Sequence, residues 1–407
     1  MSMRPVAEQW DVLKRGVDAI VPEAEFLQKL ERSVKTGTPL RVKYGIDPTG
    51  IDVHLGHTVP LRKLRQFQDL GHTAIIIIGN YTALVGDPSG RDETRASLTQ
   101  AQVEANAVDY LRQVGRIIDL ERAEVHRNGD WFGNWSFLEV LDLMRRMTLG
   151  QISARDDFAK RIAAGRPVYL HECLYPLMQG WDSVEIRADV ELGGTEQLFS
   201  LLVARDLQQE RGQSPQVAMT MPILVGTDGT RRMGKSLGNY IGVAESAEQQ
   251  FGKVMSIPDG PMRQYFTLLT DLPTAEVERV LGPSVNPRDA KEALGRAIVE
   301  QYHGADAAER AAGEFRRRAR GDDPDDVPVV EISREEQDAD GRIVAPTLLV
   351  LAGLETSKSN ARRVIEQGGF NHGPDREGVT DPKSALLVYD GMVLRVGKRK
   401  VVQVKLT

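Results

Sequence analysis

Four consecutive isoleucines, Ile75–Ile78, stand among segments that alternate between strand-like and helix-like patterns. An uninterrupted apolar run of this length is typical of a strand buried on both faces, as in parallel sheets. Strand patterns cover residues 41–46, 74–79, 123–127, 188–192 and 217–224, and helical patterns cover 58–70, 98–118, 137–146, 169–184 and 195–208. This order predicts an α/β fold with a doubly wound parallel sheet, whose ligands bind at the carboxyl ends of the strands.

The pattern changes after Tyr240, where the sequence becomes mostly helical and then ends in a small mixed unit. Residues 287–302 and 305–318 are the clearest helices, and a unit beginning near Pro346 shows two helical segments followed by two short strands. The ranges we predict are an N-terminal helical segment at 1–36, the main α/β domain at 37–240, an α-helical domain at 241–320, an acidic linker at 321–340 and a small α+β domain at 341–407.

Charge is distributed unevenly along the 407 residues, although the net charge is only −6. Residues 341–407 carry eleven Lys and Arg against six Asp and Glu, a net of +5, so the rest of the chain carries −11. The basic end follows the acidic, proline-containing segment 321–340, whose composition predicts a flexible linker. A basic terminal unit favours an interaction with nucleic acid that the net charge alone would hide.

The sequence contains no pattern typical of membrane insertion or export. No apolar run reaches the ~20 residues that span a bilayer, and residues 1–11 have neither a signal-peptide core nor a transit-peptide bias. We therefore expect a cytoplasmic protein with no membrane partner. Cys173 is the only cysteine, which excludes an intrachain disulfide and a thiolate zinc cage, and we expect no protein-bound metal.

The first candidate for chemistry is His54-Leu55-Gly56-His57, at the start of the helix that follows the first strand. Gly56 leaves room for a ligand near the backbone, and the free amides with the helix dipole favour an anion, so two imidazoles would flank a phosphate. Taken alone, the motif is equally compatible with two structural histidines. A zinc pair is a further alternative, disfavoured because no third ligand lies nearby in the sequence.

The second candidate is Arg231-Arg232-Met233-Gly234-Lys235-Ser236, which is flanked by Gly229 and Gly238. Cations between glycines suit a loop that closes on a polyphosphate and opens to release product. By itself the segment is also typical of a solvated basic turn. Its combination with the histidine motif on an alternating chain resembles the two signature sequences of class I aminoacyl-tRNA synthetases.

The third candidate is Gly86-Asp87-Pro88-Ser89-Gly90, which is followed by Arg91 and Arg95. It lacks the Gly-Lys-Ser/Thr ending of a phosphate-binding P-loop, and we exclude that interpretation. Because it lies just beyond the isoleucine strand, at the edge where ligands bind, Asp87 is a candidate to hold an ammonium group. A surface turn of ordinary type is the alternative.

The fourth candidate is a set of three polar residues, Tyr175, Gln179 and Asp182, whose spacing places them on one face of a helix. Polar groups on a face that is otherwise rich in Leu and Met favour a lined pocket. Pro176 is expected to kink the helix and shift this register. A solvated helix face is the alternative.

Six segments together resemble the tyrosyl-tRNA synthetase family, and the resemblance runs over nearly the whole chain. They are Gly-Ile-Asp-Pro-Thr at 45–49, His-Leu-Gly-His at 54–57, Gly-Asp-Pro-Ser-Gly at 86–90, Tyr-x-x-x-Gln-x-x-Asp at 175–182, Leu-Gly-Gly-Thr-Glu-Gln at 192–197 and Arg-Met-Gly-Lys-Ser at 232–236. The resemblance implies a Rossmann-like catalytic domain that activates L-tyrosine with ATP and then esterifies it to tRNA(Tyr).

The resemblance also implies a role for each matching residue. The catalytic residues would be His54, His57, Arg232 and Lys235. The ATP contacts would be Gly45, Asp47, Thr49, Gly56, Arg91, Arg95, Gly194, Glu196, Met233 and Ser236. The tyrosine contacts would be Asp87, Tyr175, Gln179, Asp182 and Gln197, with Asp182 accepting a hydrogen bond from the phenol. ATP is expected to arrive with Mg²⁺.

The chain departs from the family pattern at several positions. Leu55 stands where isoleucine is commoner, Arg232 replaces the first lysine of the lysine loop, and Gly234 replaces its central serine. Lys43 stands where many members place a tyrosine that touches the phenol, as in a bacterial branch whose strand reads Val-Lys. A pairing of Lys43 with Asp182 is the alternative, and the sequence leaves the role of Lys43 in phenol recognition open.

The basic end resembles an S4 RNA-binding module in residues 351–354, 357–363, 368–369 and 396–400. Its candidate contacts with RNA phosphates are Lys358, Arg362, Arg363 and Lys398. A solvated basic face is the alternative. The resemblance further implies a homodimer bridged by tRNA, with the helical domain on the anticodon side.

Three other functions fit part of the pattern. Tryptophanyl-tRNA synthetases share the catalytic fold but lack the S4-like end. An RNA-binding protein that kept the shape without the chemistry is disfavoured because both histidines and Lys235 are present. A nucleotidylyltransferase with the same histidine motif is disfavoured by the two additional units directed at RNA.

Overall fold

The computed structural model describes residues 3–50, 53–89, 98–320, 327–397 and 400–407. The chain forms two compact units, Met1–Gly304 and Ala305–Thr407. Their content of a parallel sheet, helices and a small α+β end confirms the predicted fold class. The division into two units rests on compactness alone, so the domain ranges predicted from the sequence stay predictions.

The first unit is built on a six-stranded sheet with the order β1-β6-β5-β2-β3-β4. Strands β2 to β6 run parallel, and the edge strand β1 pairs antiparallel with β6. The strand order reverses between β2 and β5, which makes this point the switch point of a doubly wound sheet. The strands are β1 Ala19–Val21, β2 Arg41–Ile46, β3 Thr73–Ile78, β4 Glu124–Arg127, β5 Val190–Gly194 and β6 Val217–Met221.

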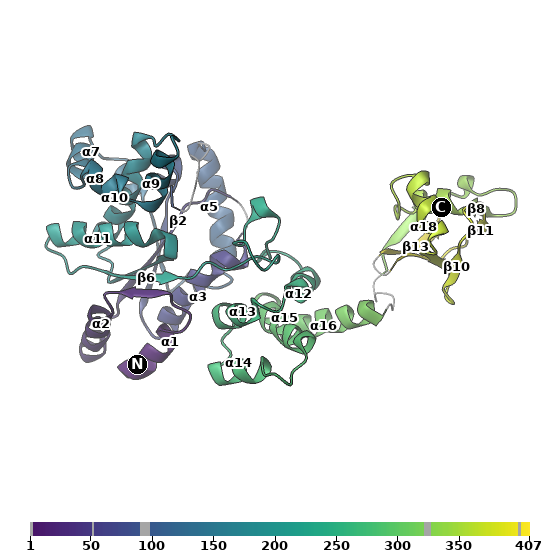
Figure 1. The fold of residues 1–407 in the computed structure, drawn as a ribbon, viewed down its shortest axis with the longest axis horizontal. Coiled ribbons are helices and arrows are strands. Elements are labelled where there is room, and N and C mark those ends of the chain that lie inside the picture. Colours follow the sequence, from purple (N-terminus) through teal and green to yellow (C-terminus); the bar gives the residue numbers. More distant parts are fainter. Residues whose placement is uncertain (1–2, 51–52, 90–97, 321–326, 398–399) are drawn as a thin grey trace. The chain divides into compact units, whose positions relative to one another are not determined.

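Helices cover both faces of this sheet (Figure 1). They are α1 Val6–Leu13, α2 Glu23–Thr36, α3 Leu55–Asp69, α4 Thr82–Val85, α5 Gln100–Val114, α6 Gly129–Phe132, α7 Phe137–Met144, α8 Leu149–Ser153, α9 Asp156–Ala163, α10 Leu170–Glu185 and α11 Leu198–Glu210. The 3₁₀ turns are η1 Thr195–Gln197 and η2 Lys235–Leu237. The unit ends with α12 Ala247–Ser256, α13 Met262–Leu269, α14 Thr274–Val280 and α15 Pro287–His303.

The isoleucine run contributes to two separate cores, because successive side chains of a strand point to opposite faces. Ile76 and Ile78 join the main core together with Leu64 of α3. Ile75 and Ile77 face the other way and pack with Ile186, just after α10. All four isoleucines are buried, as expected for a central strand of a parallel sheet.

The second unit contains a five-stranded sheet, β10-β9-β12-β13-β7, and a two-stranded sheet, β11-β8. Helices α17 and α18 pack against each other, and Leu348, Ala361 and Phe370 lie in the shared core. The elements are α16 Ala305–Arg320, β7 Val329–Ile332, η3 Arg334–Glu336, β8 Arg342–Val344, α17 Ala345–Leu351, α18 Lys358–Glu366, β9 Phe370–His372, β10 Glu377–Val379, β11 Ala385–Leu387, β12 Val393–Val396 and β13 Lys400–Leu406.

Two local expectations need correction. Val329–Ile332, inside the segment interpreted as a flexible linker, forms β7 and pairs in parallel with β13, so these residues belong to the folded unit. The N-terminal segment predicted to be helical contains the strand β1. Helix α10 runs from Leu170 to Glu185 with Pro176 inside it, and the kink expected there stays a prediction. Within the described ranges, no helix is both long and apolar enough to cross a membrane.

Candidate active site

Several of the described site residues of the first unit lie at the carboxyl ends of β2 and β5, on either side of the switch point. Asp47 follows β2 directly, Gly194 is the last residue of β5, and His54 caps the start of α3. Gly45 of β2 faces open space, since an added Cβ would have no neighbour within 4 Å. A ligand can therefore approach the backbone of the central strand closely.

Asp47 is held in place by two hydroxyl groups. Its Oδ1 accepts a hydrogen bond from Thr82 Oγ1 at 2.7 Å, and its Oδ2 accepts one from the Tyr175 hydroxyl at 2.9 Å. Gly79 permits this arrangement, because a Cβ there would lie 2.1 Å from Asp47 Oδ1. The amide of Thr49 donates to the main-chain oxygen of Asp47 at 2.7 Å. Burial, reinforced by Asp47, raises the pKa of Tyr175 well above its ordinary value, so its phenol stays protonated.

Asp87 and Gln197 lie side by side at this edge of the sheet. Gln197 Nε2 donates to Asp87 Oδ2 at 3.3 Å, while Gln197 Oε1 accepts from the Gly194 amide at 2.9 Å. The amide of Ser89 donates to the other oxygen of Asp87 at 2.8 Å. Burial raises the pKa of the neighbouring Glu196, and the charge of Asp87 adds to this effect while Arg232 opposes it. Asp87 and Arg232 therefore both lie close enough to Glu196 to affect its pKa.

Asp182 lies buried on α10, with only 3% of its surface exposed. Its two oxygens accept hydrogen bonds from Asn128 Nδ2 at 3.3 Å and from Trp131 Nε1 at 3.0 Å. Burial raises the pKa of Asp182 to about 7, an effect that the charge of Lys43 partly offsets. A carboxylate that accepts one bond on each oxygen keeps lone pairs for a further donor.

Lys43 pairs with Glu191 and not with Asp182, the alternative that the sequence left open. Lys43 Nζ lies 2.9 Å from Glu191 Oε1, and it also donates to Ser183 Oγ and to the main-chain oxygen of Gln179. The reason is strand order, because β2 lies beside β5 and Lys43 is the register partner of Glu191. Gln179 Nε2 donates to Glu191 at 3.1 Å, and Gln179 Oε1 is buried without a hydrogen-bond partner among the described residues.

His54 and His57 stack on each other at the start of α3, with ring centroids 3.7 Å apart. His54 Nδ1 accepts from the Gly56 amide at 3.2 Å, and His57 Nδ1 accepts from the His54 amide at 3.3 Å. Burial and the charge of Lys235 lower the pKa of His54 to about 4, so this ring is neutral at pH 7. With Nδ1 accepting, the proton of a neutral ring lies on Nε2, which makes it a donor.

Gly56 is required by this stack. A Cβ on Gly56 would lie 2.9 Å from the His54 ring, and its next neighbour would be Met233 Cβ at 3.6 Å. Met233 is buried, and its amide donates to Leu224 O, which anchors the lysine loop beside the histidine motif. Arg232, Lys235 and Ser236 lie on the loop itself. The charge of Arg232 acts to lower the pKa of Glu196, and the charge of Lys235 acts to lower the pKa of His54.

The two signature motifs are joined by their backbones. The amide of Leu55 donates to Ile241 O and the amide of Val243 donates to Val53 O, both at 2.9 Å, so the chain after the lysine loop pairs with the chain entering α3. At the base of the loop, Asn239 accepts from the Gly234 amide and donates to Asp228. The histidines and the lysine loop, far apart in the sequence, therefore form one structural element.

The predicted RNA contacts lie in the second unit. Lys358, Arg362 and Arg363 are exposed on α18, while Ala361 and Ile365 face its core. The remaining predicted residues, Arg91, Arg95 and Lys398, lie outside the described residues. Within the described ranges, no group of three His, Cys, Asp or Glu side chains could hold a metal ion.

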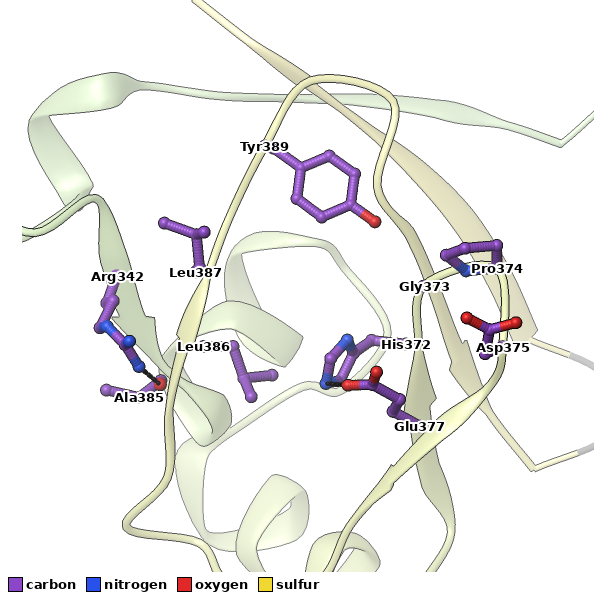
Figure 2. A pocket seen from close by; sticks show the side chains of 10 residues that line it. All are labelled: Arg342, His372, Gly373, Pro374, Asp375, Glu377, Ala385, Leu386, Leu387 and Tyr389. Carbon is purple, nitrogen blue, oxygen red and sulfur yellow. Dashed lines mark hydrogen bonds and ion pairs between the residues drawn. The ribbon is translucent and has the colours of Figure 1, made fainter.

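A cavity of about 340 Å³ also opens in the second unit, between the β9–β10 hairpin and β11 (Figure 2). Its lining includes His372, which faces Glu377, together with Asp375, Arg342 and the ring of Tyr389. It contains none of the predicted site residues. Two carboxylates in its wall disfavour an RNA phosphate, so α18 remains the better candidate for that contact.

The sequence interpretation missed Asn128 and Trp131, which hold Asp182. Asn128 follows β4 directly, so the rule that selected Asp87, a polar residue beyond the end of a parallel strand, could have found it. Trp131 lies in the short helix α6 and has no comparable signal. The sequence interpretation also missed the polar layer beneath Gln179, which is formed by Glu191, Ser183 and Gln216.

Comparison with known protein families gives a match to class I tRNA synthetases for tryptophan and tyrosine over residues 35–319. The tyrosine–tRNA ligase of Symbiobacterium thermophilum is 50% identical over 405 residues, covering 98% of each chain. That of Moorella thermoacetica is 50% identical over 400 residues, covering 97% of this chain and 95% of that protein.

Solved structures show the same fold. A C-terminally truncated mitochondrial tyrosyl-tRNA synthetase from Aspergillus nidulans superposes with a TM-score of 0.63 at 23% identity, covering 77% of this chain and 94% of that one. The tyrosyl-tRNA synthetase from Archaeoglobus fulgidus, solved with L-tyrosine, gives a TM-score of 0.60 at 22% identity, covering 76% of this chain and 100% of that one.

Proposed function

The chain belongs to the class I tyrosyl-tRNA synthetases, and from this premise we propose how its residues share the reaction. The enzyme activates L-tyrosine with ATP to tyrosyl-adenylate and pyrophosphate, and then transfers tyrosine to the 3′-terminal adenosine of tRNA(Tyr). One observation carries the assignment of residues: Asp47, which accepts hydrogen bonds from Thr82 and Tyr175, follows the strand whose Gly45 faces open space at the switch point of the sheet.

We assign the ammonium group of tyrosine to Asp87, Tyr175 and Gln179. The Tyr175 hydroxyl donates a hydrogen bond to Asp47, so its oxygen can accept from the substrate. Gln179 Oε1 is a buried acceptor without a partner among the described residues. Asp182 accepts from the phenol at the other end of the pocket. Gln197 supports this arrangement by its hydrogen bond to Asp87.

Activation requires no protein nucleophile. The tyrosine carboxylate attacks the α-phosphorus, a new C–O–P linkage forms, and the bond to pyrophosphate breaks, so the protein contributes position and charge. We assign His54 and His57 as Nε2–H donors to the phosphates. Arg232 and Lys235 supply positive charge to the leaving pyrophosphate, from a loop that can close and open.

The remaining ATP contacts follow from the position of the strand ends. Gly45, Asp47, Thr49 and Gly56 line the entry to α3, where the backbone approaches the nucleotide, and Gly194 with Glu196 closes the opposite side. Mg²⁺ enters as part of the ATP substrate, because it prefers phosphate oxygens and water to an all-protein cage. The proposed site of action is the cytoplasm, where tRNA is charged.

The basic residues of α18 are proposed to bind tRNA without taking part in activation. Wild-type protein should catalyse ATP–pyrophosphate exchange with tyrosine alone among the twenty amino acids. The variant K358A/R362A/R363A should keep this exchange within about twofold but lose about 10- to 100-fold in kcat/KM for tRNA charging, with a salt dependence that flattens by roughly 0.7–0.9 per lost phosphate contact.

The enzymatic function and the role of α18 in tRNA binding can be disproved independently. Exchange that does not require tyrosine would disprove the function, whereas normal charging by the triple variant would disprove only the role of α18. The control is Lys405→Ala, which removes an exposed basic residue of the same unit, one that pairs with Glu331 of β7 at 2.8 Å. This change should leave both activities intact.

An exposed apolar patch supports the proposed homodimer. Phe137 and Leu138 of α7, Leu149 of α8 and Leu170 of α10 are each at least 74% exposed, and α7 packs against α10. Large exposed apolar side chains on packed helices are typical of an interaction surface, and a twofold axis would bury them against the same residues of a second copy. We therefore propose this patch as the subunit interface.

Leu138→Glu combined with Leu149→Glu should convert the dimer into monomers, because a charge buried at an apolar interface is costly. Sedimentation of the wild type should give twice the monomer mass, and sedimentation of the variant the monomer mass. Val108→Glu, at a 65% exposed position on α5, is the control and should remain dimeric. A monomeric wild-type protein at micromolar concentration would argue against the interface.

A further inference from the structure

Beneath the tyrosine pocket lies an ion pair that is completely removed from water. Lys43 of β2 and Glu191 of β5 are register partners, their side chains are 0% and 1% exposed, and Lys43 Nζ lies 2.9 Å from Glu191 Oε1. Replacing such a pair with apolar side chains is often neutral for stability, since desolvation offsets the attraction. Stability alone is therefore a weak reason for two charges at this position.

Both side chains of the pair are hydrogen-bonded to neighbouring groups. The three N–H groups of Lys43 have three acceptors: Gln179 O at 2.7 Å, Ser183 Oγ at 2.8 Å and the Glu191 carboxylate. Glu191 in turn accepts from Ser183 Oγ at 2.9 Å and from Gln216 Nε2. Most of these contacts connect the central strands to the helix that lines the pocket.

Gln179 is the one predicted tyrosine contact that both charges touch among the described residues. Lys43 holds its main-chain oxygen, and Glu191 accepts from its side-chain Nε2 at 3.1 Å. An ionised carboxylate can only accept hydrogen bonds, so it fixes which end of the Gln179 amide faces it. The amide nitrogen must turn toward Glu191, and Oε1 is left as the buried acceptor without a described partner.

From this geometry we infer that Lys43 and Glu191 are positioning residues for amino-acid binding, which orient Gln179 so that its oxygen accepts from the substrate ammonium group. Lys43 pairs with Glu191 and anchors α10 to β2, and Glu191 orients the side-chain amide of Gln179. The inference rests on the proposed role of Gln179 in binding tyrosine. It also assigns Lys43 a role at the ammonium end of the substrate, in place of contact with the phenol.

The test compares two ligands that differ only in the ammonium group, L-tyrosine and 3-(4-hydroxyphenyl)propanoate, by calorimetric titration of the full-length protein. In the variant K43M/E191M, whose apolar pair can pack without buried charge, the Kd for tyrosine should rise about 10- to 100-fold. The Kd for the propanoate should change by less than about twofold, because that ligand never contacts Gln179 through an ammonium group.

A swapped pair separates positioning from mere charge balance. K43E/E191K keeps both charges but presents an ammonium group to the Gln179 amide, which then turns its oxygen inward, so tyrosine binding should stay weak. Recovery of wild-type affinity in the swap would overturn the inference. Equal weakening of both ligands in the apolar variant would also overturn it, since that result indicates general damage to the pocket.

Two further variants complete the experiment. Gln179→Ala should weaken tyrosine binding by itself, and adding K43M/E191M to it should cause little further loss; if Gln179→Ala has no effect, the proposed pocket rather than the pair is at fault. Lys29→Met removes another buried lysine, paired with Asp189 at 3.1 Å at the start of β5. It should leave both affinities unchanged, which controls for the loss of a buried charge.

Discussion

Replacing Lys235 with alanine should slow tyrosyl-adenylate formation by about 10²–10³-fold, with little change in the affinity for tyrosine. Lys235 is exposed on η2, and its charge already reaches His54, whose pKa it helps to lower. A cation on a loop that closes over the leaving pyrophosphate acts mainly in the transition state. Rapid-quench measurement of a single turnover, together with equilibrium binding of tyrosine, checks both parts of the prediction.

Arg231 provides the matched control on the same loop. Its side chain is 59% exposed and its guanidinium pairs with Asp228 at 2.9 Å, so it faces the base of the loop. Arg231→Ala should therefore reduce the rate by no more than a few-fold, as expected for an exposed ion pair. A normal rate of adenylate formation in Lys235→Ala would remove this residue from the catalytic set.

Replacing Asp182 with alanine should reduce the preference for tyrosine over phenylalanine by at least about 10²-fold in the ratio of kcat/KM. Tyrosyl-tRNA synthetases are the standard example of such discrimination, and the known preference of the family is about 10⁵. An acceptor that phenylalanine leaves unpaired in a buried site is costly, and the alanine variant has no such acceptor. Pyrophosphate exchange with each amino acid measures the ratio.

The ionisation of Asp182 gives the same assignment a pH test. Its pKa of about 7 means that it becomes a carboxylate, the stronger acceptor, as the pH rises through 7, so kcat/KM for tyrosine should fall on the acid side. The folded pKa lies above the unfolded one, so the contribution of Asp182 to folding stability is complete below the unfolded pKa and is lost as the pH rises through 7. Asp182→Asn should abolish the step in activity, and a step that persists would assign it to another group.

The sequence was most informative where the chain obeys local rules. The strand predicted at 41–46 coincides with β2, because its apolar alternation and the Asp-Pro turn are both local signals. The motifs also predicted the family and the reaction, and both are confirmed. The individual roles of the site residues stay predictions until the variants above are measured.

The partner of Lys43 could not be predicted from the sequence, because strand order is not a local property. Nothing near Lys43 indicates that β5, which follows β4 in the chain, lies beside β2 rather than beside β4. The pairing with Glu191 exists only because the sheet reverses there. The linker interpretation failed for a similar reason, since β7 is stabilised by β13, which lies much further along the chain.

The backbone pairing between residues 53–55 and 241–243 also bears on how the enzyme is made. During synthesis the histidine motif leaves the ribosome long before Ile241, and until Ile241 arrives the amide of Leu55 lacks its native acceptor. A product terminated within the lysine loop would carry both histidines but could not complete the ATP site. We therefore expect such an incomplete chain to be inactive in tyrosine-dependent pyrophosphate exchange.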